Sequence, residues 1–344
     1  MKQRIFYFDF LRIFAALAVV MLHTAASQYG LEGIYHDSAC LYDGFVRWCV
    51  PIFVMISGAL FLEPAKTITI NNILKKYIPR IVIIFFVWSL FYTCLSCFSK
   101  NNFNFAFIII NIIYGYYHMW FLYMIAGLYL IIPFLRPITE KKDKNLILYL
   151  LIIWLVAASI IPFINFMFPI TKMFSEFIIK NKFYFSFPLS FIGYFVLGYY
   201  LHNYVNIGKN IILIVTLILS FFITVIGDTI YSLPNKQSFF FDNFSPFVII
   251  TAISIFLLIK NKCYQIKQPN KVILKLSDLT LGVYMIHPFF IFVLTKLNLF
   301  GFINFQLNDN NFVAIPIAFV LVSFLSFSSV YLLSKIPFVK KFVC

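Results

Sequence analysis

The chain alternates between long apolar runs and short polar breaks marked by charge, Pro, Asn and Gly, and this pattern predicts membrane helices. A helix needs about 20 apolar residues to cross a bilayer. Ten runs approach or reach that length, at residues 5–27, 44–62, 78–98, 119–136, 146–164, 187–204, 210–231, 244–260, 279–298 and 312–334. A further apolar segment, from Phe103 to Tyr114, is too short to span. We expect an interfacial or re-entrant segment there.

The composition narrows the class of protein. Of the 344 residues, 62% are hydrophobic and 11% are charged, whereas soluble domains average about 45–50% and about 25%. These values exclude an ordinary soluble enzyme, and they exclude a nucleic-acid binder in spite of the net charge of +15. We predict an all-α, polytopic membrane protein of about ten transmembrane helices that forms one domain over residues 1–344 and has no nucleic-acid partner.

The distribution of Lys and Arg predicts the orientation of these helices. If the N-terminus is cytoplasmic, the loops on the outer side contain five lysines, whereas most other cations fall on the inner side; the five are Lys100, Lys172, Lys180, Lys182 and Lys236. The positive-inside rule then places both chain ends in the cytoplasm. We expect an acidic first outer loop containing Glu32, Asp37 and Asp43.

Three ionisable residues share one face of the first predicted helix. At 100° per residue, Arg12 and His23 differ by about 20° around the helix axis, and Asp9 lies about 60° from Arg12. His23 lies about 16 Å further along the axis than Arg12. Ionisable groups at bilayer depth are costly and mark functional sites, so we predict Asp9, Arg12 and His23 as catalytic residues. The alternative is a structural Asp–Arg pair with a hydrogen-bonded histidine. Asp9 and Arg12 also argue against cleavage of this helix as a signal peptide.

Other polar residues mark the fourth and ninth runs. His118 and Trp120 stand at the start of the fourth run, and Tyr284 and His287 lie in the ninth. We expect these four residues to contact a substrate; an interfacial or capping role for the histidines and an aromatic belt are the alternatives. In the second run, Gly58 lacks a side chain and allows another helix to approach closely.

A basic cluster opens the third run. Lys75, Lys76 and Arg80 would suit a polyphosphate or an anionic lipid headgroup, and the alternative is a topology signal alone. The cysteines have no zinc-site spacing, and the sequence contains no phosphate-binding loop. We expect no metal site.

Four motifs occur in one order along the chain. They are residues 7–12 (YFDFLR) followed by His23, residues 50–58 (VPIFVMISG), residues 118–123 (HMWFLY) and residues 282–288 (GVYMIHP). In this order they resemble the bacterial integral-membrane acyltransferases of type 3 over essentially the whole chain. The short loops look most like the members that O-acetylate surface polysaccharides such as the enterobacterial common antigen. Relatives often carry an Arg-rich motif where this chain has Lys75, Lys76 and Arg80 around Pro79.

The resemblance implies a membrane-bound O-acyltransferase of the bacterial cytoplasmic (inner) membrane. Its co-substrate would be acetyl-CoA, with no bound cofactor, and its acceptor a glycolipid or polysaccharide surrounded by membrane lipid. The phosphates of CoA would meet Lys75, Lys76 and Arg80. The imidazole of His23 could act as general base or carry the acyl group transiently. Arg12 stays protonated, so it would stabilise an oxyanion or a phosphate instead.

Three other functions compete with this interpretation. A transporter or flippase of lipid-linked sugars could use Asp9, Arg12 and His23 as a proton relay, but the paired broken helices typical of such proteins are not seen in the sequence. A polysaccharide polymerase would need a larger, Arg-rich outer loop. A purely structural protein would leave the polar face of the first helix unexplained.

Overall fold

The computed structural model describes residues 4–26, 34–168, 190–208, 210–232, 238–263, 266, 270–297 and 311–343. Within these ranges the regular elements are all helices, which confirms the predicted all-α fold. The first half of the chain forms α1 (Phe6–Ala26), α2 (Ile34–Val46), α3 (Cys49–Phe61), α4 (Ile70–Asn72), α5 (Ile78–Lys100), α6 (Phe105–Tyr114), α7 (Trp120–Glu140), α8 (Lys144–Leu155) and α9 (Ile161–Met167). The second half forms α11 (Ser190–Tyr204), α12 (Asn210–Tyr231), a 3-10 turn (Phe239–Phe241), α13 (Pro246–Cys263), α14 (Lys271–Leu297), α15 (Asn311–Leu333) and α16 (Pro337–Val343).

Nine helical segments in the described ranges are long and apolar enough to cross a membrane. They are Phe6–Ala26, Asp37–Phe61, Ile70–Lys100, Trp120–Glu140, Lys144–Met167, Asn210–Tyr231, Phe239–Cys263, Lys271–Lys296 and Phe312–Leu333. Each coincides with a predicted apolar run. The remaining run, 187–204, coincides with α11, which has 15 described residues; residues 187–189 lie outside the described ranges. The protein is therefore a polytopic membrane protein.

Two of these spans contain a π-helical turn directly before a proline. One turn, Ile73–Tyr77, joins α4 to α5 just before Pro79, and the other, Val156–Ile160, joins α8 to α9 just before Pro162. Proline has no N–H and its ring collides with the preceding turn of a regular helix. The wider π turn accommodates that loss, so each helix continues through its proline. The first of these turns also carries Lys75 and Lys76.

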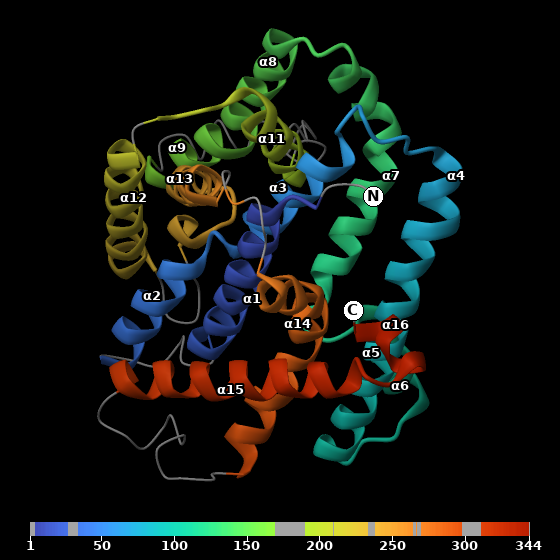
Figure 1. The fold of residues 1–344 in the computed structure, drawn as a ribbon. Helices are drawn as coiled ribbons and strands as arrows, with labels where there is room; N and C mark the ends of the chain where they lie inside the picture. Colours follow the sequence, from blue (N-terminus) through green and yellow to red (C-terminus); the bar gives the residue numbers. More distant parts are fainter. Residues whose placement is uncertain are drawn as a thin grey trace.

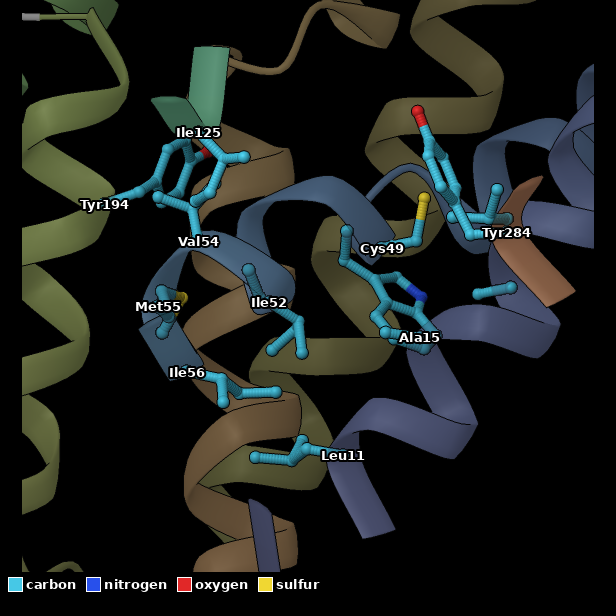
Figure 2. Packing of buried hydrophobic residues seen from close by; sticks show 14 of the residues in the cluster. Leu11, Ala15, Cys49, Ile52, Val54, Met55, Ile56, Ile125, Tyr194 and Tyr284 are labelled. Atoms are coloured by element: carbon cyan, nitrogen blue, oxygen red, sulfur yellow. The ribbon is translucent and has the colours of Figure 1, made fainter. Parts of the chain in front are cut away.

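Helix α1 lies at the centre of the bundle, where it contacts α2, α3, α13, α14 and α15. Figure 1 shows α1 beside α14, which follows it by more than 240 residues in the sequence. The core around α1 is apolar (Figure 2): Leu11 and Ala15 of α1 and Cys49 and Ile52 of α3 are all fully buried. On the predicted polar face of this helix, Asp9 is fully buried, whereas Arg12 and His23 are half-buried.

Helices α3 and α11 meet at glycines on both sides. A Cβ atom on Gly58 would lie 1.7 Å from the carbonyl oxygen of Phe195, and one on Gly198 would lie 1.9 Å from that of Met55. Any side chain at either position would collide with backbone. The close contact predicted for Gly58 is confirmed, and its partner is α11.

The short apolar segment forms α6, a helix of ten residues. Its side chains are largely exposed, including Phe105 and Ile110. It is held against α5 by the Ser89 hydroxyl, which donates to the carbonyl of Ile112 at 2.7 Å. The segment is thus too short to span, as predicted.

The acidic first outer loop is not what the structure contains. Asp37 and Asp43 lie within α2, and Asp43 is fully buried in an ion pair with Arg47 one turn later. Arg47 also donates to the carbonyl of Phe241 and covers its ring at 4.6 Å. The prediction is wrong for Asp43 because a carboxylate neutralised at i+4 can be buried inside a helix. Glu32 lies outside the described residues.

Candidate active site

The N-terminal part of α1 carries an ionic cluster built around Asp9. The Asp9 carboxylate is fully buried and accepts from Arg4 through both oxygens, at 2.8 Å from Nε and 2.7 Å from Nη2. It also accepts from Arg12 at 3.2 Å and from the Ser277 hydroxyl at 2.7 Å. Arg4 reaches Asp278 as well, at 2.8 Å. Two arginines thus face two aspartates, which joins α1 to α14.

This arrangement limits what Asp9 can do. Its Oδ1 accepts from Arg4, Arg12 and Ser277, and its Oδ2 accepts from Arg4, so most of the acceptor sites of the carboxylate are engaged within the cluster. The hydrogen bond to Asp9 raises the pKa of Arg4 above its ordinary value, and Arg4 therefore stays charged. The geometry makes Asp9 a positioning residue for the arginines.

Beside this cluster lies a cavity of about 440 Å³. Arg12 and Arg80 both line it, with Asp278 and the hydroxyl-bearing residues Ser57, Tyr77, Tyr129, Ser277 and Thr280; its apolar walls include Phe53, Phe121 and Ile125. Two guanidinium groups in a largely apolar cavity provide a site for an anionic group attached to an apolar chain.

At its other end, α1 meets two further histidines. Nδ1 of His23 lies 2.7 Å from Nε2 of His287 on α14, and the two rings stack with centroids 4.9 Å apart. The ring of His118, at the start of α7, lies 5.5 Å from that of His287 and is buried. Neither ring nitrogen of His118 has a hydrogen-bond partner among the described residues. Three histidines far apart in the sequence therefore converge, although no metal-binding geometry occurs among the described residues.

The hydrogen bonds determine which nitrogen of each ring carries the proton. Nδ1 of His287 lies 3.1 Å from the carbonyl oxygen of Val283. A carbonyl only accepts, so this nitrogen is the donor. In a neutral His287, Nε2 is then the acceptor, and the hydrogen between the two rings belongs to Nδ1 of His23. His23 is left with its lone pair on Nε2, which is the requirement for a base or nucleophile.

His23 also lines a second cavity, of about 420 Å³. The other lining residues come from the end of α1, from the segment before α7 and from the later part of α14: Ala26, Tyr116, Tyr117, Pro288, Ile291, Phe292 and Thr295. Along α14, the first cavity touches Ser277 to Leu281 and the second begins at Pro288. Tyr284 and His287 lie between the two cavities on this helix.

Tyr284 is held in that intermediate position. It is buried, and its hydroxyl donates to the backbone carbonyl of His118. Tyr92 donates to the carbonyl of Met285 at 2.6 Å and stacks on Tyr116. A layer of aromatic and imidazole rings thus separates a cavity containing arginines from a cavity containing His23.

Comparison with known proteins identifies the family to which this chain belongs. The sequence profile of the acyltransferase domain, family 3, matches residues 5–335. The chain belongs to this acyltransferase family. With nine apolar helical segments in the described part of the chain, it is a multi-pass membrane acyltransferase.

One curated relative is longer than this chain. A protein of Enterococcus faecalis named amino-acid racemase is 26% identical over 315 residues, which are 87% of this chain and 42% of the relative. The acyltransferase thus spans less than half of that protein, whose name describes the longer chain. No solved structure matches the acyltransferase.

The structure brings some of the other predicted residues to the site and leaves one apart. The rings of His118 and His287 lie 6.4 and 4.9 Å from that of His23, and Tyr284 contacts His118 and His287. Trp120 is 42% exposed and its ring packs near Phe191 on α11. The structure therefore does not place Trp120 with the histidines of the acyltransferase.

The basic cluster divides between two cavities. Lys75, Lys76 and Arg80 line a third cavity, of about 830 Å³, and Arg80 also lines the one that contains Arg12. Arg80 therefore belongs to both. Arg4 and Asp278 were not among the residues predicted from the sequence for this site. The available signal for Arg4 was Asp9, since a buried carboxylate requires a nearby cation.

Proposed function

We propose that the acyltransferase moves an acyl group, most simply acetyl, from cytoplasmic acyl-CoA to a hydroxyl of a cell-surface or lipid-linked saccharide in the bacterial inner membrane. The observation that carries the proposal is the arrangement along α1 and α14. A cavity with Arg12 and Arg80 lies at one end of this helix pair, and His23 with a defined lone pair lies at the other.

The arginines suit the donor. CoA is a polyanion, and Arg12 and Arg80 would hold it by charge-assisted hydrogen bonds. Because Arg12 and His23 are about 16 Å apart along the helix, they cannot both touch one carbonyl. Arg12 therefore holds the donor, and the acyl group reaches His23 past Tyr284.

His23 suits the chemical step. In direct transfer, Nε2 takes the proton of the acceptor hydroxyl while that oxygen attacks the thioester carbonyl carbon. The new C–O bond forms, the C–S bond breaks, and the thiolate of CoA receives the proton from His23. His287 supports this role, since its Nε2 accepts the Nδ1–H of the imidazolium that forms. Asp9 and Arg4 contribute by holding Arg12.

His23 could instead carry the acyl group on Nε2. In that case the protein would retain label after incubation with labelled acetyl-CoA and no acceptor, and would release it on addition of glycolipid. Direct transfer would leave no label on the protein. Acid-quenched filter binding of wild-type protein and of His23→Gln distinguishes the two routes.

The proposal is tested by label transfer. Purified wild-type protein, His23→Ala and Arg12→Ala would be incubated with labelled acetyl-CoA and envelope glycolipid, with Lys144→Ala as a control that removes an exposed cation. We expect label in the glycolipid with wild type and with the control, and none with His23→Ala. Movement of glycolipid across the bilayer without release of CoA would support a flippase and overturn the proposal.

A further inference from the structure

The third cavity joins two segments that are distant in the sequence. It has a volume of about 830 Å³ and lies between the start of α5 and the C-terminal helix α16. Lys75, Lys76 and Arg80 line it from one side, and Lys340 and Lys341 line it from the other. No Asp or Glu is among the lining residues. Hereafter this space is called the basic pocket.

Helix α16 is held in place against α5. The indole Nε1 of Trp88 donates to the carbonyl of Phe342 at 3.2 Å, and α16 also packs against α14 and α15. In Figure 1, α16 lies beside α5. An orientation signal would require these lysines only to be on one side of the membrane. Their convergence on one pocket requires another explanation.

The chemistry of the lining points to a ligand with several phosphates. The cations around this space repel one another, and a polyanion bound among them would relieve that repulsion. Phe338 contributes a ring that is 71% exposed, and an exposed aromatic face can stack on a nucleobase. Arg80 connects the basic pocket to the cavity of Arg12. A ligand could therefore place its phosphates in the basic pocket and extend an apolar arm into the cavity of Arg12.

We propose that Lys340 and Lys341 of α16 bind the nucleotide end of the acyl donor, an adenosine diphosphate with a 3′-phosphate, together with Lys75 and Lys76. Phe338 stacks on the adenine. The proposal rests on the proposed function for the identity of the donor. It adds to the site a helix more than 250 residues distant from the basic cluster at the start of α5.

Binding of CoA to the full-length protein tests this assignment without catalysis. The protein would be held in nanodiscs of zwitterionic lipid, and the dissociation constants of CoA and 3′-dephospho-CoA measured by calorimetry. We expect Lys340→Gln/Lys341→Gln to weaken CoA binding at least about tenfold, because each charge-assisted contact contributes strongly. The same double substitution should weaken the binding of 3′-dephospho-CoA by a smaller factor. The control variant Lys141→Gln/Lys144→Gln lacks two exposed cations outside the basic pocket. It should bind CoA as tightly as wild type does.

Two further measurements keep the outcomes separate. Lys340→Arg/Lys341→Arg retains both charges and should bind CoA nearly as well as wild type, which would show that the loss in the Gln variant is not misfolding. His23→Ala should also bind CoA, since His23 lies outside the pocket. If His23→Ala transfers acyl groups normally, the proposed function fails while this inference stands.

The result that would overturn the inference is unchanged CoA affinity in the Lys340→Gln/Lys341→Gln variant. A lipid headgroup is the other source of phosphate. If the pocket binds a headgroup instead, wild type would not bind CoA in zwitterionic lipid, and wild type but not the Lys340→Gln/Lys341→Gln variant would retain phosphatidylglycerol during purification. That pattern would assign the pocket to lipid.

Discussion

His287 determines which nitrogen of His23 is basic. Replacing it with Phe removes the acceptor of the His23 Nδ1–H bond and leaves the proton free to sit on either nitrogen. We expect His287→Phe to lower kcat for acyl transfer by about 100-fold with little change in KM for the donor. In His287→Gln the side-chain carbonyl can accept the same bond, so this variant should recover part of the rate. Equal activity of the Phe variant and wild type would contradict the role.

Asp9 stabilises the fold by pairing with two partly exposed arginines. In Asp9→Asn, Arg4 keeps Asp278 but Arg12 loses its ionic partner, and we expect a loss of about 2 kcal/mol. The fraction of monomer that survives heating in detergent, followed by size-exclusion chromatography, measures the loss. Glu140 is 52% exposed and also pairs with an arginine, Arg136, so Glu140→Gln should cost less than about 1 kcal/mol. Equal sensitivity of the two variants would contradict this account.

The sequence contained part of this residue-level information. The spacing of Asp9, Arg12 and His23 placed them on one face of α1, and in the structure Asp9 and His23 meet Ser277 and His287 of the same helix, α14. Their partners could not be predicted, because helical periodicity within α1 says nothing about which distant helix lies opposite. The tautomer of His23 depends on such a partner.

At the scale of elements, the contact between α3 and α11 depends on two glycines. We expect Gly58→Ala or Gly198→Ala to destabilise the protein by at least about 3 kcal/mol, since the added methyl group meets backbone and the helices must separate. Gly127 in α7 is the matched control, because a Cβ there would meet nothing within 4 Å. Heating in detergent compares the three variants, and a Gly58→Ala protein as stable as Gly127→Ala would contradict the packing.

The apolar runs predicted nearly every spanning helix, because hydropathy reports directly on burial in lipid. The residue at which a helix begins, and whether a charged residue lies inside it, were harder to predict from the sequence. The third run was predicted to begin at residue 78, yet the chain is helical from Ile70 and reaches Pro79 through a π turn. Asp43 reads as a loop residue, yet Arg47 allows it to lie inside α2. Both depend on local hydrogen bonding, which an apolar count does not measure.

For the whole molecule, the charge distribution predicts that both chain ends face the cytoplasm. Single cysteines at Lys141 and Lys341 should then react with an impermeant maleimide only after the inner membrane is opened, whereas one at Lys100 should react in intact spheroplasts. The background would carry Ser in place of the exposed or half-buried Cys94 and Cys263 and of Cys344. Labelling of Lys341→Cys from outside would contradict the orientation and would move the basic pocket away from cytoplasmic CoA.

We propose that His23 acts on an acyl group supplied at the end of the molecule where Arg12 and Arg80 lie. The most direct test uses sealed proteoliposomes containing acceptor glycolipid, with labelled acetyl-CoA added only on the side that Lys341 faces. We predict that wild-type protein releases CoA and labels the glycolipid in equal amounts. His23→Ala should bind CoA but do neither. Transfer by His23→Ala at the wild-type rate would contradict the account.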